Sequence, residues 1–236
     1  MPRPGGGPTV VSAVAPEPRC AVTRAALAAS TVAVLNRGNR RNPDVLLVEH
    51  GGERLVVKDF APRGPLVRAT LGRLIAAREV RALQQLAGHP AVPAFRGWID
   101  PLAFALEYRP GERMSRQLAG RVPPDFVARL ESAFAEMHRR GVAHLDLRHR
   151  SNVLVAEDGS PVLIDFGSAV CFRPGSAGAR WLLPLLARVD RGALAKWRVR
   201  LEGPTPALAQ RAAGSTGSGD AAGSGSGARR GASRPT

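Results

Sequence analysis

Cysteine, aromatic residues and long apolar runs are all scarce in this sequence. The two cysteines, Cys20 and Cys171, are too few for a disulfide framework, and nothing near them resembles a zinc site. Aromatic residues make up 5% of the chain, which argues against a surface that stacks the bases of single-stranded nucleic acid. The nearest approach to a membrane-spanning run, residues 25–35, is too short to cross a bilayer.

Negative charge is also in short supply. The chain has 34 basic and 19 acidic residues, a formal net charge of +15, and only Lys58 and Lys196 among the basic residues are lysines. Such an excess attracts polyanions such as nucleotide phosphates, RNA or an anionic membrane surface. The positive charge is spread along the chain, so an arginine-rich genomic composition with no partner behind it is the alternative explanation.

The two ends differ from the centre in composition. Residues 1–29 are rich in proline and glycine at the start and are expected to be a flexible leader, without the pattern of a signal peptide. Residues 204–236 are rich in glycine, serine and alanine and are expected to be disordered. The length of the chain allows one domain, or two small lobes that share a cleft.

The most informative stretch is residues 141–169. Two apolar runs, 152–155 and 161–164, flank the turn sequence E-D-G-S, which predicts a β-hairpin. Asp146 precedes the first strand and Asp165 follows the second. An antiparallel pair brings both carboxylates to the same end of the hairpin, where they are either a catalytic pair or simple turn caps.

This stretch resembles the protein-kinase-like superfamily. Residues 144–147 read H-L-D-L, similar to the kinase H-R-D-L loop, Asn152 follows, and residues 165–167 read D-F-G. The resemblance extends from about residue 34 to about residue 201 and is closest to the small atypical branch of RIO-type kinases and bacterial lipopolysaccharide core-sugar kinases. It implies that Asp146 orients the acceptor hydroxyl, while Asn152 and Asp165 bind Mg²⁺ on ATP.

Further positions match the same pattern upstream. Residues 56–58 read V-V-K, like the end of the kinase V-A-I-K strand, so the resemblance assigns Lys58 to the ATP phosphates. Glu79 lies on the apolar stripe of a helix expected over residues 66–86 and needs a partner there. Lys58 is the proposed partner, and a surface pair of Glu79 with a neighbouring arginine is the alternative.

The nucleotide site is less well marked. Residues 37–42 stand where a kinase has its glycine-rich loop, but Gly38 alone survives of that pattern, so an ordinary basic turn is the alternative. The break at residues 109–111 is expected to be the hinge between the lobes. The backbone of Glu107, Tyr108 and Arg109 would then face the adenine.

The catalytic loop departs from the kinase pattern in three respects. Asn152 is six residues after Asp146 rather than five, which leaves the second metal site in doubt. Arg148 stands where many protein kinases have a lysine that contacts the transferred phosphoryl group. Leu145 replaces the loop arginine, and no A-P-E motif follows, so we expect no control by activation-loop phosphorylation.

The sequence therefore predicts an α+β, two-lobed, protein-kinase-like fold. Residues 30–109 would form an N-lobe with an antiparallel sheet of strands, including 31–36, 44–49 and 54–59, and one long helix. Residues 110–203 would form a reduced, mainly helical C-lobe, with a helix over 125–140 and two short basic helices over 180–188 and 191–200.

The predicted function is transfer of the γ-phosphate of Mg-ATP to a hydroxyl, with a protein serine or threonine as the preferred acceptor. A lipopolysaccharide core sugar is the alternative acceptor. A non-catalytic pseudokinase scaffold and a basic RNA-binding module are the alternatives of other classes. A cytoplasmic location is expected, with contact to the inner membrane through the basic surface left open.

Overall fold

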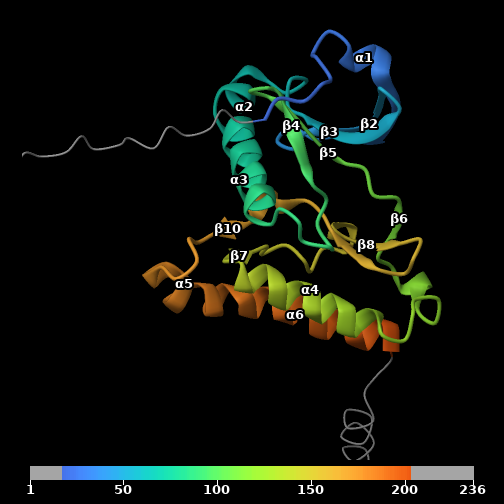
Figure 1. Cartoon of the computed structure of the whole chain (residues 1–236), viewed down its shortest axis with the longest axis vertical. Helices are drawn as coiled ribbons and strands as arrows, with labels where there is room; N and C mark the ends of the chain where they lie inside the picture. Colours follow the sequence, from blue (N-terminus) through green and yellow to red (C-terminus); the bar gives the residue numbers. More distant parts are fainter. Residues whose placement is uncertain (1–17, 203–236) are drawn as a thin grey trace, which may run out of the picture.

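The computed structural model describes residues 18–202 as two lobes, one above the other (Figure 1). The upper lobe is an antiparallel sheet flanked by helices, and the lower lobe combines short strands with two long, adjacent helices. This confirms the predicted two-lobed α+β architecture. The predicted disordered tail and the first 17 residues of the predicted leader lie outside the described residues.

The sheet of the upper lobe has the spatial order β1-β2-β3-β5-β4, with every adjacent pair antiparallel. Its strands are β1 (Thr31–Asn36), β2 (Asp44–His50), β3 (Glu53–Asp59), β4 (Phe95–Asp100) and β5 (Ala103–Glu107). Because side chains alternate along a strand, Leu55 and Val57 face one side of β3 while Val56 and Lys58 face the other. Lys58 thus faces the same side as Val56, which packs against the main core shared with the lower lobe.

The long helix expected over residues 66–86 is interrupted. The structure has α2 (Pro65–Ala69) and α3 (Leu71–Gln85), separated at Thr70, whose φ of −126° and ψ of −84° are not helical. The Thr70 hydroxyl donates to the carbonyl of Leu66. A threonine hydroxyl that bonds to its own preceding turn competes with the helix, which accounts for the break.

Residues 18–30 are packed against the sheet, so the prediction of a flexible leader is wrong for residues 18–29. Val22 and Leu27, the latter in α1 (Leu27–Ser30), are buried on the outer face of the sheet. The Arg24 guanidinium donates to the carboxylates of Asp59 at 2.7 Å and Asp100 at 2.5 Å. This segment therefore covers a face that would otherwise expose apolar side chains to water.

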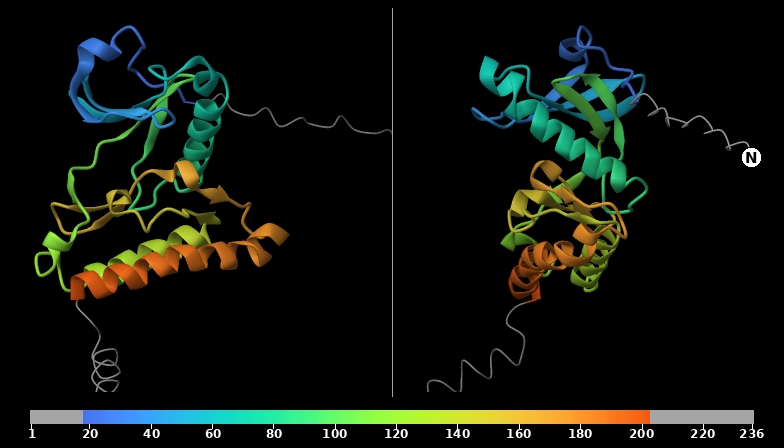
Figure 2. Two further views of the ribbon diagram at one scale, coloured as in Figure 1. Left: turned by 180° about the vertical axis from the view of Figure 1, so that it is seen from behind. Right: turned by 90° about the vertical axis from the view of Figure 1, so that its left-hand side faces the viewer.

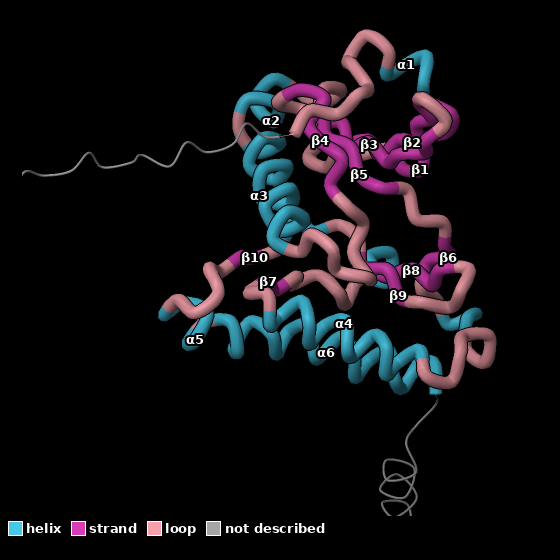
Figure 3. Tube along the Cα trace, in the orientation of Figure 1, coloured by secondary structure: helices cyan, strands magenta, loops and turns pink. Residues whose placement is uncertain are grey.

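In the lower lobe, α4 (Phe126–Arg139) and α6 (Leu183–Glu202) lie side by side (Figure 3). Above them lie the predicted hairpin, with strand β6 added at its edge, and the pair formed by β7 and β10. The bounds are β6 (Gly111–Arg113), β7 (Val142–Ala143), β8 (Val153–Ala156), β9 (Pro161–Leu163), β10 (Val170–Cys171) and α5 (Ala177–Trp181). Three short 3-10 helices are η1 (Arg116–Leu118), η2 (Arg150–Asn152) and η3 (Phe166–Ser168).

The two short helices expected over 180–188 and 191–200 are wrong, because α6 runs unbroken through Asp190. Six of its buried positions, spaced alternately by four and three residues, form one continuous stripe of a single helix: Leu183, Ala187, Asp190, Leu194, Trp197 and Leu201. Buried Ala193 lies beside this stripe. None of the helices within residues 18–202 combines the length and the apolar character needed to span a membrane.

Two segments lie between the lobes, as the rear and side views show (Figure 2). One leads from β5 to β6. The other, between α3 and β4, reaches down to the hairpin, where the Leu163 amide donates to the Ala91 carbonyl at 2.7 Å. The first segment thus reaches β8, with which β6 pairs, and the second reaches β9, so both fix the upper lobe over the hairpin.

Candidate active site

Lys58 is the centre of a three-residue charge cluster between the lobes. Its Nζ lies 2.7 Å and 2.9 Å from the two carboxylate oxygens of Glu79 and 2.7 Å from Asp165 Oδ1. The predicted pair with Glu79 is therefore present. The alternative, a surface pair of Glu79 with an arginine, is wrong, because Glu79 is only 1% exposed.

The protonation equilibria of the three groups are interdependent. Burial alone would lower the pKa of Lys58, but the two carboxylates outweigh it and raise that pKa well above its ordinary value. The Lys58 ammonium in turn holds the pKa of Asp165 below its usual range. Burial raises the pKa of Glu79, against the opposing effect of Lys58. Loss of Lys58 would thus raise the pKa of Glu79 further.

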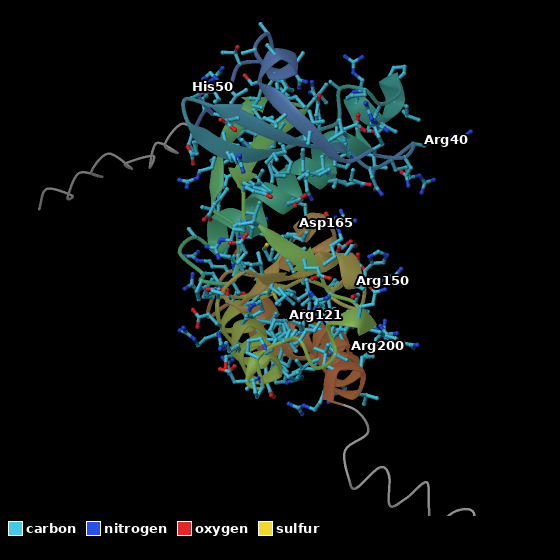
Figure 4. All side chains as sticks on the ribbon, turned by 90° about the vertical axis from the view of Figure 1, so that its right-hand side faces the viewer. Arg40, His50, Arg121, Arg150, Asp165 and Arg200 are labelled. Carbon is cyan, nitrogen blue, oxygen red and sulfur yellow. The ribbon has the colours of Figure 1, made fainter. Side chains whose placement is uncertain are left out.

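Asp165 has a backbone conformation that few residues other than glycine adopt. Its φ of 69° and ψ of 66° lie in the left-handed region. The turn is held in place by the next residue, since the Phe166 amide donates to Glu79 Oε1 at 3.2 Å and the Phe166 ring packs against His144. The result is that the Asp165 side chain, 53% exposed, projects from the end of β9 toward the space between the lobes (Figure 4).

Asp146 and Asn152 are in direct contact despite the extra residue in the loop. Asn152 Nδ2 donates to Asp146 Oδ2 at 2.9 Å and to the Asp146 carbonyl at 3.0 Å. The short helix η2 accommodates the additional residue, and Ser151 Oγ donates to Asn152 Oδ1 at 3.1 Å. The loop therefore keeps the buried asparagine beside the carboxylate that the sequence predicts as the base.

Helix α6 holds this loop from below through residues that the sequence analysis missed. Asp190 Oδ2 and Oδ1 accept the backbone N–H groups of His144 at 3.0 Å and Leu145 at 2.9 Å. Lys196 Nζ donates to the carbonyl of Arg148 and Trp197 Nε1 to that of Leu147. The signal was available, because Asp190 lies on an apolar helical stripe just as Glu79 does.

We predict that Asp190→Ala destabilises the fold by about 3 kcal/mol or more, because two buried N–H groups would lose their acceptor. Leu145, one of the two donors, has a strained φ of 68° that these bonds help to maintain. Urea unfolding measures the effect. Asp190→Asn, which keeps an acceptor oxygen, should be less destabilised. A change below about 0.5 kcal/mol in Asp190→Ala, the ordinary range for surface substitutions, would show that the loop does not depend on α6.

Two buried histidines make stability depend on pH. Burial lowers the pKa of both His89 and His144, and each bonds as a neutral ring: Nδ1 accepts a backbone N–H while Nε2 faces a carbonyl. The unfolded chain binds protons below about pH 6.5 at these positions and the folded chain does not. The contribution of these two histidines to the free energy of unfolding is therefore complete above that pH and is lost as the pH falls below it.

The expected loss is about 1.4 kcal/mol per pH unit for each histidine below about pH 6.5, down to the lowered pKa of the folded state. Urea unfolding between pH 7.5 and 5.5 measures it. His89→Gln should remove about half of the slope. A slope that stays the same in His89→Gln contradicts the assignment.

A cavity of about 210 Å³ lies between the lobes beside the charge cluster. Its walls combine apolar side chains from both lobes with polar groups at one end: Leu35, Val56, Lys58, Glu79, Leu83, Pro93, Leu106, Glu107, Tyr108, Arg109, Gly111, Arg113, Leu154, Leu163, Ile164, Asp165 and Phe166. The segment from Glu107 to Arg109 runs along one wall of this cavity. A flat, apolar, hydrogen-bonding ring fits such a wall.

Not every predicted residue lines this cavity. Glu107, Tyr108, Arg109, Lys58, Glu79 and Asp165 do, while Gly38, Asp146, Arg148 and Asn152 do not. The packing of its own loop requires a glycine at position 38, because a Cβ there would lie 2.1 Å from the Asn42 carbonyl oxygen. Its N–H is bonded to Asp44 and its carbonyl to Arg63. Gly38 thus allows two backbone segments of the β1–β2 loop to approach each other closely.

Comparison with known proteins agrees with this geometry. Residues 70–174 match the model of a family described as "Phosphotransferase enzyme family". Over these residues the chain is similar to phosphotransferases of the protein-kinase-like superfamily. It is 34% identical over 115 residues to "Calcium-dependent protein kinase 27" of Oryza sativa, and 31% identical over 140 residues to "Probable SapB synthase" of Streptomyces coelicolor. These stretches cover 42% and 50% of the chain but only 18% and 15% of the two relatives.

The kinase-like site offers few protein ligands to a metal ion, and this fits Mg²⁺. No cluster of three or more histidine, cysteine or acidic side chains suited to a metal occurs in the described part of the chain. Mg²⁺ bound with a nucleotide typically takes one or two carboxylates and completes its shell with phosphates and water. The half-exposed carboxylate of Asp165 meets that requirement, and the Asn152 amide oxygen is the second candidate.

Proposed function

We propose that the chain transfers the γ-phosphoryl group of Mg-ATP to the hydroxyl of an acceptor. The observation that carries this proposal is the contact of Lys58 with both Glu79 and Asp165 at the back of the interlobe cavity. An ammonium fixed by two carboxylates is suited to bind phosphate oxygens, and the bound nucleotide supplies the phosphoryl group.

Each residue of the site has a separate role in the proposed reaction. Asp146 accepts the proton of the acceptor hydroxyl, and its contact with Asn152 fixes its orientation. Asp165 and Asn152 bind the metal, and Glu79 positions Lys58. Arg148, exposed at the surface of the loop, offers a guanidinium to the transferred group. The backbone of Glu107, Tyr108 and Arg109 binds the adenine.

A protein serine or threonine is our preferred acceptor, supported by the similarity to a relative named as a protein kinase. A lipopolysaccharide core sugar is the alternative, because the matched family is described only as phosphotransferases. A non-catalytic nucleotide-binding scaffold is a third candidate. The position of Gly38 outside the cavity favours it, since the glycine loop then contributes nothing to the phosphates.

To test the proposal, the protein is incubated with labelled Mg-ATP in two parallel reactions. One reaction contains cell extract and the other contains purified lipopolysaccharide. The matched control is Asp146→Asn, which keeps the size and the hydrogen bond of the side chain but removes the base. We expect label in the protein fraction with the unmodified chain and little with the variant. Label in lipopolysaccharide would support the sugar acceptor. Mg-ATP binding without transfer in either fraction would support the scaffold.

A further inference from the structure

A second cavity, of about 440 Å³, opens on the lower lobe outside the nucleotide cavity. We call it the arginine pocket. Its lining residues come from η1, η2 and the end of α6: Ser115, Arg116, Gln117, Arg150, Trp197 and Arg200. Arg150 and Arg200 project on the same side of the molecule, below Asp165 (Figure 4). None of these residues lines the nucleotide cavity.

The three arginines of this pocket have no acidic partner within residues 18–202. By contrast, Arg121 of the same lobe pairs with Glu112, and Arg129 with Asp125. Three guanidinium groups around one cavity repel each other, and an anion between them relieves that repulsion. Guanidinium also matches the oxygens of a phosphate geometrically, through paired N–H donors.

Ser115 provides an independent indication. Its hydroxyl oxygen is buried and has no hydrogen-bond partner. Ser115 also stands at the N-cap of η1, where a serine side chain commonly accepts a backbone N–H, yet it makes no such bond. A buried hydroxyl without a partner is costly, so its presence beside three unpaired arginines indicates a ligand that supplies the missing acceptor.

The arginine pocket is attached to the proposed catalytic loop. Trp197, one of its walls, donates its Nε1–H to the carbonyl of Leu147, the residue after Asp146. Arg150 is four residues after Asp146, so their Cα atoms lie within about 14 Å of each other. The Arg200 guanidinium lies 5.2 Å from the Trp197 ring, which orients it within the pocket. A molecule of modest size can therefore place one group in the pocket and another beside Asp146.

We propose that the arginine pocket binds a phosphomonoester group of the acceptor, so that the hydroxyl beside it is presented to Asp146. This inference rests on the proposed phosphotransferase function and names its substrate class: a hydroxyl compound that already carries a phosphate. A phosphorylated sugar and a phosphorylated peptide share this chemistry. A neutral or cationic acceptor does not, because it would leave the three arginines and the Ser115 hydroxyl unmatched.

The first experiment measures inorganic phosphate binding by calorimetry, with the nucleotide site saturated by Mg²⁺ and a non-hydrolysable ATP analogue. We expect saturable binding that weakens at least tenfold in Arg116→Gln and in Arg150→Gln, and severalfold in Ser115→Ala. Arg150→Lys, which keeps the charge, should retain part of the affinity. Arg188→Gln is the matched control, because Arg188 is exposed on α6 away from the pocket and the substitution removes the same charge.

Ser115→Ala separates ligand binding from folding. Because a buried hydroxyl without a partner costs stability, its removal should leave the melting temperature unchanged or raise it slightly, while phosphate binding falls. Absence of phosphate binding in the unmodified protein, or equal binding in Arg150→Gln and Arg188→Gln, overturns the proposal.

The second experiment compares acceptors that differ only by a phosphate: glucose with glucose 6-phosphate, and a serine peptide with the same peptide carrying a neighbouring phosphoserine. We expect kcat/KM to be at least tenfold higher for the phosphorylated member of one pair. The pair that shows this preference identifies the acceptor as a phosphorylated sugar or a phosphorylated peptide. A preference for the unphosphorylated members contradicts the proposal. Asp165→Asn separates the proposed phosphotransferase function from the proposed phosphate site. The substitution should abolish transfer and leave phosphate binding to the arginine pocket intact.

Discussion

Replacing either Lys58 or Glu79 is expected to lower phosphoryl transfer about 10²–10³-fold, the usual loss when one preorganised charge is removed from a transition state. Lys58→Met removes the ammonium itself. Glu79→Gln leaves Lys58 with Asp165 as its remaining carboxylate, so that the ammonium shifts toward the turn and away from the phosphates. The affinity for ATP should fall much less than the turnover.

The double variant, Lys58→Met with Glu79→Gln, should be scarcely worse than either single variant, because all three changes break the same contact. Initial rates of transfer, or of ATP hydrolysis where no acceptor is known, complete the cycle. Glu49→Gln is the control, since Glu49 pairs with Arg54 on the surface at 3.4 Å and exposed pairs contribute about 0–1 kcal/mol. Unchanged turnover in Glu79→Gln would remove the pair from the mechanism.

Asp165→Asn should weaken Mg-ATP binding by about 10²-fold or more, since a carboxylate facing a divalent ion contributes several kcal/mol of charge stabilisation. The fold should survive, because the side chain is half-exposed and its size is kept. Calorimetric titration of ATP with and without Mg²⁺ measures the binding, and the melting temperature shows whether the fold survives.

The control for this titration is Asp158→Asn, at the exposed turn of the hairpin, which should bind Mg-ATP as the unmodified chain does. Equal affinities for the unmodified chain and Asp165→Asn would exclude Asp165 from the metal site. A collapse of the melting temperature instead would mean that its contact with Lys58 maintains the fold.

The sequence predicted those parts of the structure that depend on local pattern. The meander, the hairpin and the inward position of Glu79 all follow from alternation, a Gly-containing turn or helical periodicity, which neighbouring residues determine. The contact of Lys58 with Glu79 was predicted from two sources: an inward carboxylate requires a partner, and the resemblance to kinases pairs this lysine with this glutamate.

Features that depend on distant contacts were missed. The packing of residues 18–30 depends on Arg24, whose partners Asp59 and Asp100 are far away in the sequence. The continuity of α6 was missed because Asp190 looks like a helix end, until the backbone N–H groups that it accepts are known. The arginine pocket joins residues 115, 150 and 200, and no local pattern connects such positions.

The support of the catalytic loop by α6 has a consequence for synthesis of the chain. Asp190 emerges 46 residues after His144, whose backbone it binds. At about 5–20 residues per second, the loop waits roughly 2–9 seconds on the ribosome before its support exists. During that interval the upper lobe is complete while Leu145 has nothing to maintain its positive φ. A nascent chain paused after Phe166 but before Asp190 would therefore have every residue that lines the nucleotide cavity and an unsupported catalytic loop, so competence to bind ATP should precede competence to transfer phosphate.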